Sequence, residues 1–92
     1  MEKKYSDYQI MAIEQAVDEL GSKQAVADII DCSGSFITLV MQRKRVLSPM
    51  MCVKLAQVFR FIDIHKMSDV YSPNVMAWIL YKDRDFKKSK QA

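Results

Sequence analysis

Serine residues placed just ahead of apolar-periodic segments divide this chain into short helical units. Ser22, Ser33, Ser48 and Ser72 each precede such a segment. A serine oxygen accepts a hydrogen bond from the free backbone N–H groups of a helix's first turn, so serine is favoured directly before a helix. Proline follows Ser48 and Ser72 at the first helical position, where its missing N–H would have no helical partner. Apolar residues then recur every three or four positions, so the pattern predicts an all-α fold.

The expected helices are short. They cover residues 8–20, 23–30, 35–44, 49–59 and 73–81. Gly21 follows the first of these helices and is expected to end it, because glycine readily adopts the left-handed conformation that closes many helices. Residues 62–70 carry a weaker apolar pattern that fits a short turn of helix, with a β-turn or a small strand as competing interpretations. Residues 73–81 are apolar nearly all round, so this helix needs cover on more than one side.

A single domain is expected, because 92 residues suffice for one compact core. We assign residues 1–82 to this domain and residues 83–92, which are charged and have no large apolar residue after Phe86, to a disordered tail. No apolar run approaches the roughly 20 residues that cross a bilayer, and the N-terminus leads into no signal-peptide stretch. The expectation is a cytoplasmic protein without membrane contact.

Residue types for catalysis and metal binding are few and poorly spaced. Cys32, Cys52 and the single histidine His65 cannot supply a zinc-ligand set. Both cysteines are expected to act as small buried hydrophobes. The sequence contains no nucleophile elbow, phosphate loop or paired-carboxylate pattern. We therefore expect no enzymatic activity, no metal or other cofactor and no small-molecule substrate.

The charges are segregated along the chain, although the net charge is only +3. Residues 1–22 carry five acidic and two basic side chains, whereas residues 23–66 carry seven basic and three acidic ones. A positive middle segment suits an anionic polymer such as nucleic acid, and an ordinary solvated surface fits a value of this size nearly as well.

Residues 23–42 have the positional pattern of two short helices joined by a tight turn. Counting from Lys23, the fifth place needs a small residue because the two helices cross there, and it holds Ala27. The ninth place usually takes glycine because its φ is positive; Asp31, which occupies it, is one of the few other residues that tolerate that conformation. Apolar residues fill the remaining core places: Val26, Ile30, Cys32, Ile37 and Val40.

A family resemblance follows from three stretches of residues. These are Leu20-Gly21-Ser22-Lys23-Gln24-Ala25-Val26-Ala27, then Asp31-Cys32-Ser33, then Arg43-Lys44-Arg45 with Ser48-Pro49. Together they resemble the Cro and YdaS-like family of phage and prophage regulators, over residues 20–59. The resemblance implies a lambda-repressor-like helix-turn-helix bundle of about five helices with an extra C-terminal helix. It also implies a DNA-binding repressor, usually dimeric, in a bacterial cell or phage-infected host.

The helix that begins after Ser33 is expected to read double-stranded DNA in the major groove. Its outward side chains, the candidates for contact with base edges, are Gly34, Ser35, Thr38, Leu39 and Gln42. With no arginine in the middle of this helix, we expect contacts that prefer A·T pairs. The candidates for contact with phosphates are Lys23, Gln24, Ser33, Arg43, Lys44 and Arg45.

The helix around Trp78 is the expected dimer contact, with burial inside the monomer as the alternative. The residues assigned to this contact are Val75, Trp78, Ile79 and Leu80. The sequence thus predicts a dimeric, sequence-specific transcriptional regulator. The competing hypothesis is an antitoxin or adaptor that binds a protein partner on the same scaffold, favoured by the uncharged recognition helix, the modest net charge and the hydrophobic C-terminal segment.

Overall fold

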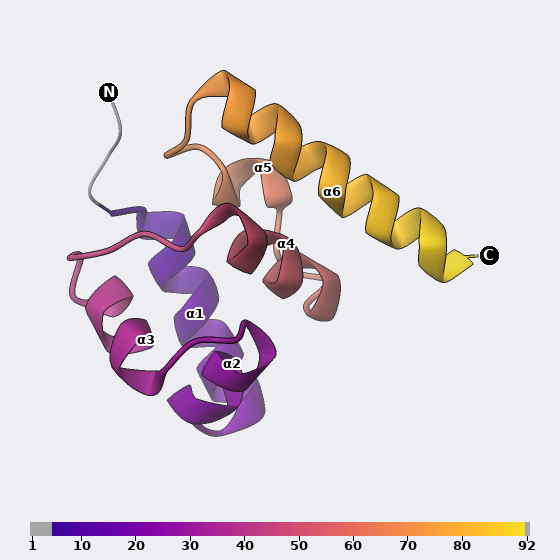
Figure 1. Ribbon diagram of the computed structural model, residues 1–92. Helices are drawn as coiled ribbons and strands as arrows, with labels where there is room; N and C mark the ends of the chain where they lie inside the picture. The colour runs from indigo at the N-terminus through magenta and orange to yellow at the C-terminus, as the bar shows by residue number, and fades with distance from the viewer. Residues whose placement is uncertain (1–4, 92) are drawn as a thin grey trace.

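Six helices follow one another in the computed structural model, which describes the backbone of residues 5–91 and the side chains of residues 5–85 (Figure 1). They are α1 (Asp7–Leu20), α2 (Lys23–Ile29), α3 (Gly34–Met41), α4 (Pro49–Val58), α5 (Ile64–Met67) and α6 (Pro73–Gln91). The described range contains no strand. The predicted all-α class is confirmed, and the weak segment after Arg60 contains a turn of helix rather than a strand.

Serine side chains cap the helices as the sequence pattern predicts. Ser22 Oγ accepts a hydrogen bond from Ala25 N at 3.1 Å, and Ser33 Oγ accepts one from Phe36 N at 3.1 Å. The serines at positions 48 and 72 accept equivalent bonds at 3.3 and 3.4 Å. Ser6, which the pattern did not single out, caps α1 in the same way. These bonds satisfy N–H groups that have no partner within the helix, so each helix begins at a defined residue.

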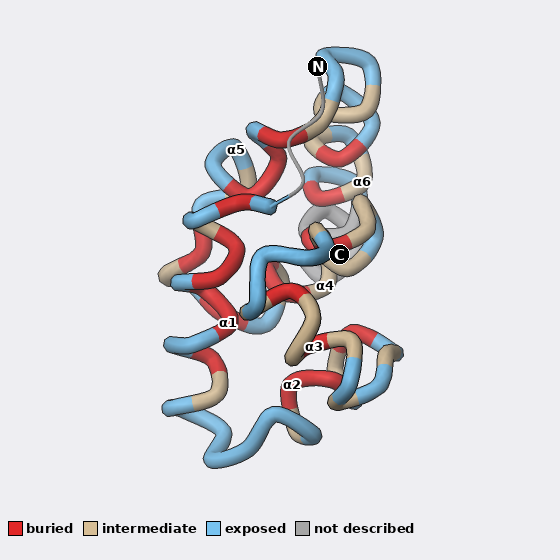
Figure 2. The backbone as a smooth tube through the Cα atoms, turned by 90° about the vertical axis from the view of Figure 1, so that its left-hand side faces the viewer, coloured by how far each residue is buried: buried red, intermediate tan, exposed pale blue. Residues whose placement is uncertain are grey.

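The core lies where α1, α2 and α3 meet α4 and α5. Figure 2 shows the buried segments turned toward one another along these helices. The buried cluster is Ala12, Ile13, Ala16, Val26, Ala27, Ile30, Ile37, Val40, Leu47, Cys52, Leu55, Ala56, Phe59, Ile62 and Met67. Burial of this apolar surface supplies the main force that holds the short helices together, since helices of this length are marginal on their own.

A buried glutamine connects separate parts of the chain beside this core. Gln9, on α1, is fully buried. Its Nε2 donates to the carbonyl oxygen of Met67 at 2.8 Å, and its Oε1 accepts from the backbone N–H of Leu47 at 2.9 Å. A single amide therefore joins α1 to the end of α5 and to the segment that precedes α4.

Helix α6 is longer than the sequence pattern predicts. It packs against α4 and α5 and continues to Gln91, beyond the expected end at residue 81. Residues 83–91 are helical in the structure, whereas the sequence pattern predicts a disordered tail at 83–92; Ala92 lies outside the described residues. The segment contains no glycine or proline to end the helix, and Asp83 on its inner side is buried. No single helix in the described range is long and apolar enough to span a membrane.

Candidate nucleic-acid interface

Helices α2 and α3 form a sharp corner. The chain turns through 105° between Lys23–Ile29 and Gly34–Met41. This angle lies in the range of about 90–120° that helix-turn-helix pairs adopt. In Figure 1, α3 lies at the edge of the molecule away from α6, and α6 packs on α4 and α5 instead. The outer side of α3 is therefore left open to solvent.

Helices α2 and α3 are expected to pack closely, because the residues assigned to their crossing are small or apolar. Ala27, which the sequence pattern assigns to the crossing, is fully buried. The apolar places that the sequence pattern assigns to the core are buried at Val26, Ile30, Ile37 and Val40, whereas Cys32 is only half-buried. A larger side chain at position 27 would separate the two helices, because a packed interior has no space for extra methyl groups.

The turn between the helices has a left-handed residue, as predicted. Asp31 has φ 56°, and the next N–H, of Cys32, donates to the carbonyl oxygen of Ala27 at 3.0 Å. This bond is part of the Schellman motif that ends many helices. The side chain of Asp31 also forms an ion pair with Lys54 of α4. No sequence pattern predicts this pair, because its partners are far apart along the chain.

The five residues expected to face bases lie together on the outer side of α3, but they are not equally free. Ser35 and Gln42 are exposed, whereas Gly34, Thr38 and Leu39 are half-exposed. Thr38 Oγ1 donates to the carbonyl oxygen of Gly34 at 3.2 Å and lies 3.5 Å from Lys23 Nζ, the donor of a second bond. The hydroxyl of Thr38 is thus engaged within the protein, and its methyl group is the part left for a partner.

Two of the residues assigned to phosphate contact have partners at the start of the helices. Gln24 Nε2 donates to Asp28 Oδ1 at 2.9 Å, and its Oε1 would lie 3.3 Å from a Cβ atom added to Gly34. The side chain of Ser33 is occupied as the cap of α3. A side chain at position 34 would therefore require a small shift of the Gln24 amide.

The basic residues after α3 differ in how they are held. Lys44 and Arg45 are exposed. Arg43 has φ 65° and closes α3: its N–H donates to the carbonyl oxygen of Val40 at 3.1 Å, and Lys44 N donates to that of Leu39 at 3.0 Å. These two bonds form a Schellman motif whose left-handed position is usually glycine. The sequence pattern placed a cation here but did not reveal its unusual backbone.

The residues assigned to the dimer contact are split between the interior and the surface. Ile79 is fully buried within the monomer, which corrects its assignment to a contact with a second copy. Val75 and Leu80 are half-buried, and Trp78 is 40% exposed. The reason is helical spacing: the inner face of α6 packs on α4 and α5, and residues three or four apart share a face, so Ile79 lies with Asp83 on the buried side while Ala77 and Trp78 are exposed.

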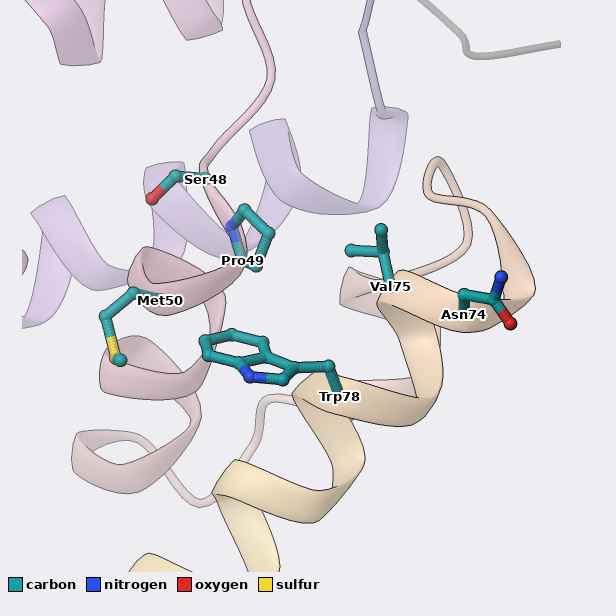
Figure 3. A pocket seen from close by; sticks show the side chains of 6 residues that line it. All are labelled: Ser48, Pro49, Met50, Asn74, Val75 and Trp78. Carbon is teal, nitrogen blue, oxygen red and sulfur yellow. The ribbon is translucent and has the colours of Figure 1, made fainter.

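An apolar groove borders Trp78 (Figure 3). It has a volume of about 480 Å³ and lies between the first turns of α4 and α6. Its lining residues are Ser48, Pro49, Met50, Asn74, Val75 and Trp78. Lys82 Nζ lies 5.8 Å from the centre of the indole ring, a cation–π distance. Tyr81, the next exposed aromatic residue on α6, is 62% exposed.

The titratable side chains of the described residues do not gather into a metal site: no group of three or more His, Cys, Asp or Glu is placed to hold an ion there. Burial raises the pKa of the Cys52 thiol to about 12, and burial followed by the charge of Asp31 raises the pKa of Cys32. Both thiols are therefore protonated at neutral pH and are weak nucleophiles.

Comparisons with protein-family models, curated proteins and solved structures found no match to this chain.

Proposed function

We propose that this protein is a sequence-specific DNA-binding transcriptional regulator, of the phage or prophage repressor kind, with a lambda-repressor-like helix-turn-helix. The observation that carries the proposal is the 105° corner between α2 and α3, with the outer side of α3 uncovered. A helix presented in this way fits the major groove, and the exposed cations at its end are suited to the flanking phosphates.

The outer side of α3 favours contacts with A·T pairs. Gln42 is exposed and its amide can pair bidentately with adenine. Thr38 and Leu39 offer methyl groups that pack on a thymine methyl, since the Thr38 hydroxyl is already bonded within the protein. Ser35 offers one exposed hydroxyl. Selection of sites from a random duplex pool tests this point, and an invariant G·C core in the selected sites would contradict it.

The regulator acts as a homodimer in the cytoplasm in this proposal. One short helix reads too few base pairs for specificity at the scale of a genome, so two copies of α3 about 34 Å apart would read a palindrome. With about four phosphate contacts per protomer, log K is expected to fall with log salt concentration at a slope of roughly −7.

A titration of labelled duplex tests the proposal. The probe is the DNA immediately upstream of the protein's own coding sequence, and the reading is fluorescence anisotropy at several salt concentrations. The double variant Lys44→Glu with Arg45→Glu is expected to abolish binding. A double variant with the same change in charge, Lys66→Glu with Arg84→Glu, reverses exposed cations on α5 and α6 and is expected to bind within a few-fold of the unaltered protein. Equal losses in the two variants would contradict a defined interface on α3.

A protein-binding module is the second candidate function. The specific observation in its favour is the uncharged groove beside Trp78, together with the exposed ring of Tyr81. In that case the chain is an antitoxin or adaptor that grips a protein partner. Absence of duplex binding at about 50 mM salt, where phosphate contacts are strong, would favour this candidate over the first.

A further inference from the structure

Arg43 is held against the N-terminal segment by two different contacts. Its Nη2 lies 3.7 Å from Asp7 Oδ1, and its guanidinium carbon lies 5.5 Å from the centre of the Tyr5 ring. The side chains of Arg43 and Asp7 are 60% and 79% exposed, so water and other ligands reach the pair. The Schellman bonds at the end of α3 fix the backbone from which the arginine extends.

The two contacts use different parts of the guanidinium. An aromatic ring attracts the flat face of the group through its quadrupole and leaves the N–H donors at the edge available. Asp7 lies beside one of these donors, Nη2, and its negative charge is placed where it would repel an incoming phosphate. The contact with Tyr5 is therefore compatible with a bound phosphate, whereas the negative charge of Asp7 opposes it.

We propose that Tyr5 and Asp7 set the phosphate affinity of Arg43 in opposite directions. Tyr5 is a positioning residue that holds the guanidinium flat with its edge exposed. Asp7 weakens phosphate binding through its negative charge beside the guanidinium. The proposal rests on the DNA-binding function above, and it assigns to the start of the chain a role that the helix-turn-helix segment alone does not supply.

Duplex affinity of single and double variants tests the proposal, with the upstream duplex as the probe. Asp7→Asn is expected to bind about two- to fivefold more tightly and Tyr5→Leu about two- to fivefold more weakly, the sizes typical of exposed ion pairs and cation–π contacts. Tyr5→Phe keeps the ring and is expected to retain the original affinity. In an Arg43→Gln background, all three substitutions are expected to have no effect, because the group they act on is absent.

Glu14→Gln is the matched control for Asp7→Asn. Glu14 is exposed on the same helix, and its substitution removes the same charge. Equal tightening by Glu14→Gln, or effects that persist in the Arg43→Gln background, would overturn the proposal while leaving DNA binding intact. Failure of the unaltered protein to bind the duplex at about 50 mM salt would instead overturn the proposed function, and this inference with it. Thermal unfolding monitored by circular dichroism verifies that each variant is folded.

Discussion

Gln9 shows how a single residue connects three parts of the chain. Its amide serves one backbone donor, at Leu47, and one backbone acceptor, at Met67, inside the core. A buried backbone group without a partner is destabilising by about 1–3 kcal/mol, so the side chain satisfies groups that no helix could. The apolar spacing of the first helix gave no reason to place a glutamine inside, because the two partners are distant in sequence.

We expect Gln9→Leu to lower the free energy of unfolding by about 2–4 kcal/mol, since it leaves the buried N–H of Leu47 without a partner and the carbonyl oxygen of Met67 with only the weak thiol donor of Cys52. Urea denaturation monitored by circular dichroism measures the change in the free energy of unfolding. Gln15→Leu is the control, because Gln15 is exposed on the same helix, and its effect is expected to stay within about 0.5 kcal/mol. Similar losses in the two variants would contradict the role given to the buried amide.

Arg43 occupies a backbone conformation that glycine adopts more easily. We expect Arg43→Gly to raise the free energy of unfolding by up to about 1 kcal/mol, because a residue with a Cβ is strained at φ 65°. The same substitution is expected to weaken duplex binding by removing a cation. Thermal unfolding and anisotropy measure the two effects.

Lys44→Gly is the comparison for this prediction, since Lys44 is not among the positive-φ residues. It is expected to weaken binding without any gain in stability. A loss of stability in Arg43→Gly as large as in Lys44→Gly would show that position 43 is not strained.

Among the helices, the corner between α2 and α3 followed closely from sequence, and the length of α6 did not. The corner depends on local features: caps at Ser22 and Ser33, a small residue at Ala27 and a tolerant residue at Asp31. The continuation of α6 to Gln91 was not predicted, because a charged composition does not distinguish a helix from a disordered tail. The ion pair between Asp31 and Lys54 was also missed, because only the folded chain brings these residues together.

Ala27→Leu tests the crossing of α2 and α3. We expect it to destabilise the protein by about 3 kcal/mol or to prevent folding, because the added methyl groups have no space at a fully buried contact. Ala77→Leu adds the same atoms at an exposed position on α6 and is expected to be nearly neutral. Thermal unfolding of both variants measures the difference. A folded Ala27→Leu protein of unchanged stability would contradict a close crossing.

Across the whole molecule, the uncovered side of α3 and the apolar groove at α4 and α6 are separate surfaces (Figures 1 and 3). Sequence reasoning identified both segments but did not determine which side of α6 is covered. Only three-dimensional packing shows that Ile79 faces inward while Trp78 borders the groove. A dimer that uses the groove would leave the outer side of α3 available to DNA.

We expect the double variant Trp78→Ser with Tyr81→Ser to shift the protein from dimer to monomer while preserving its fold, because both rings are substantially exposed within one chain. Sedimentation velocity measures the oligomeric state and circular dichroism the helical content. Val58→Ser removes another exposed apolar side chain, on α4 away from the groove-lining residues, and is expected to leave the dimer unchanged. A monomeric unaltered protein at micromolar concentration would contradict this surface as the dimer contact.

The buried amide of Gln9 also restricts how this protein can vary. An ionised glutamate would offer only acceptors to its two neighbours, lysine would offer only donors, and asparagine is one methylene shorter. Helix surfaces can drift through many substitutions without loss of the fold. We therefore expect descendants of this sequence to keep glutamine at this position while the exposed residues of α1 diverge.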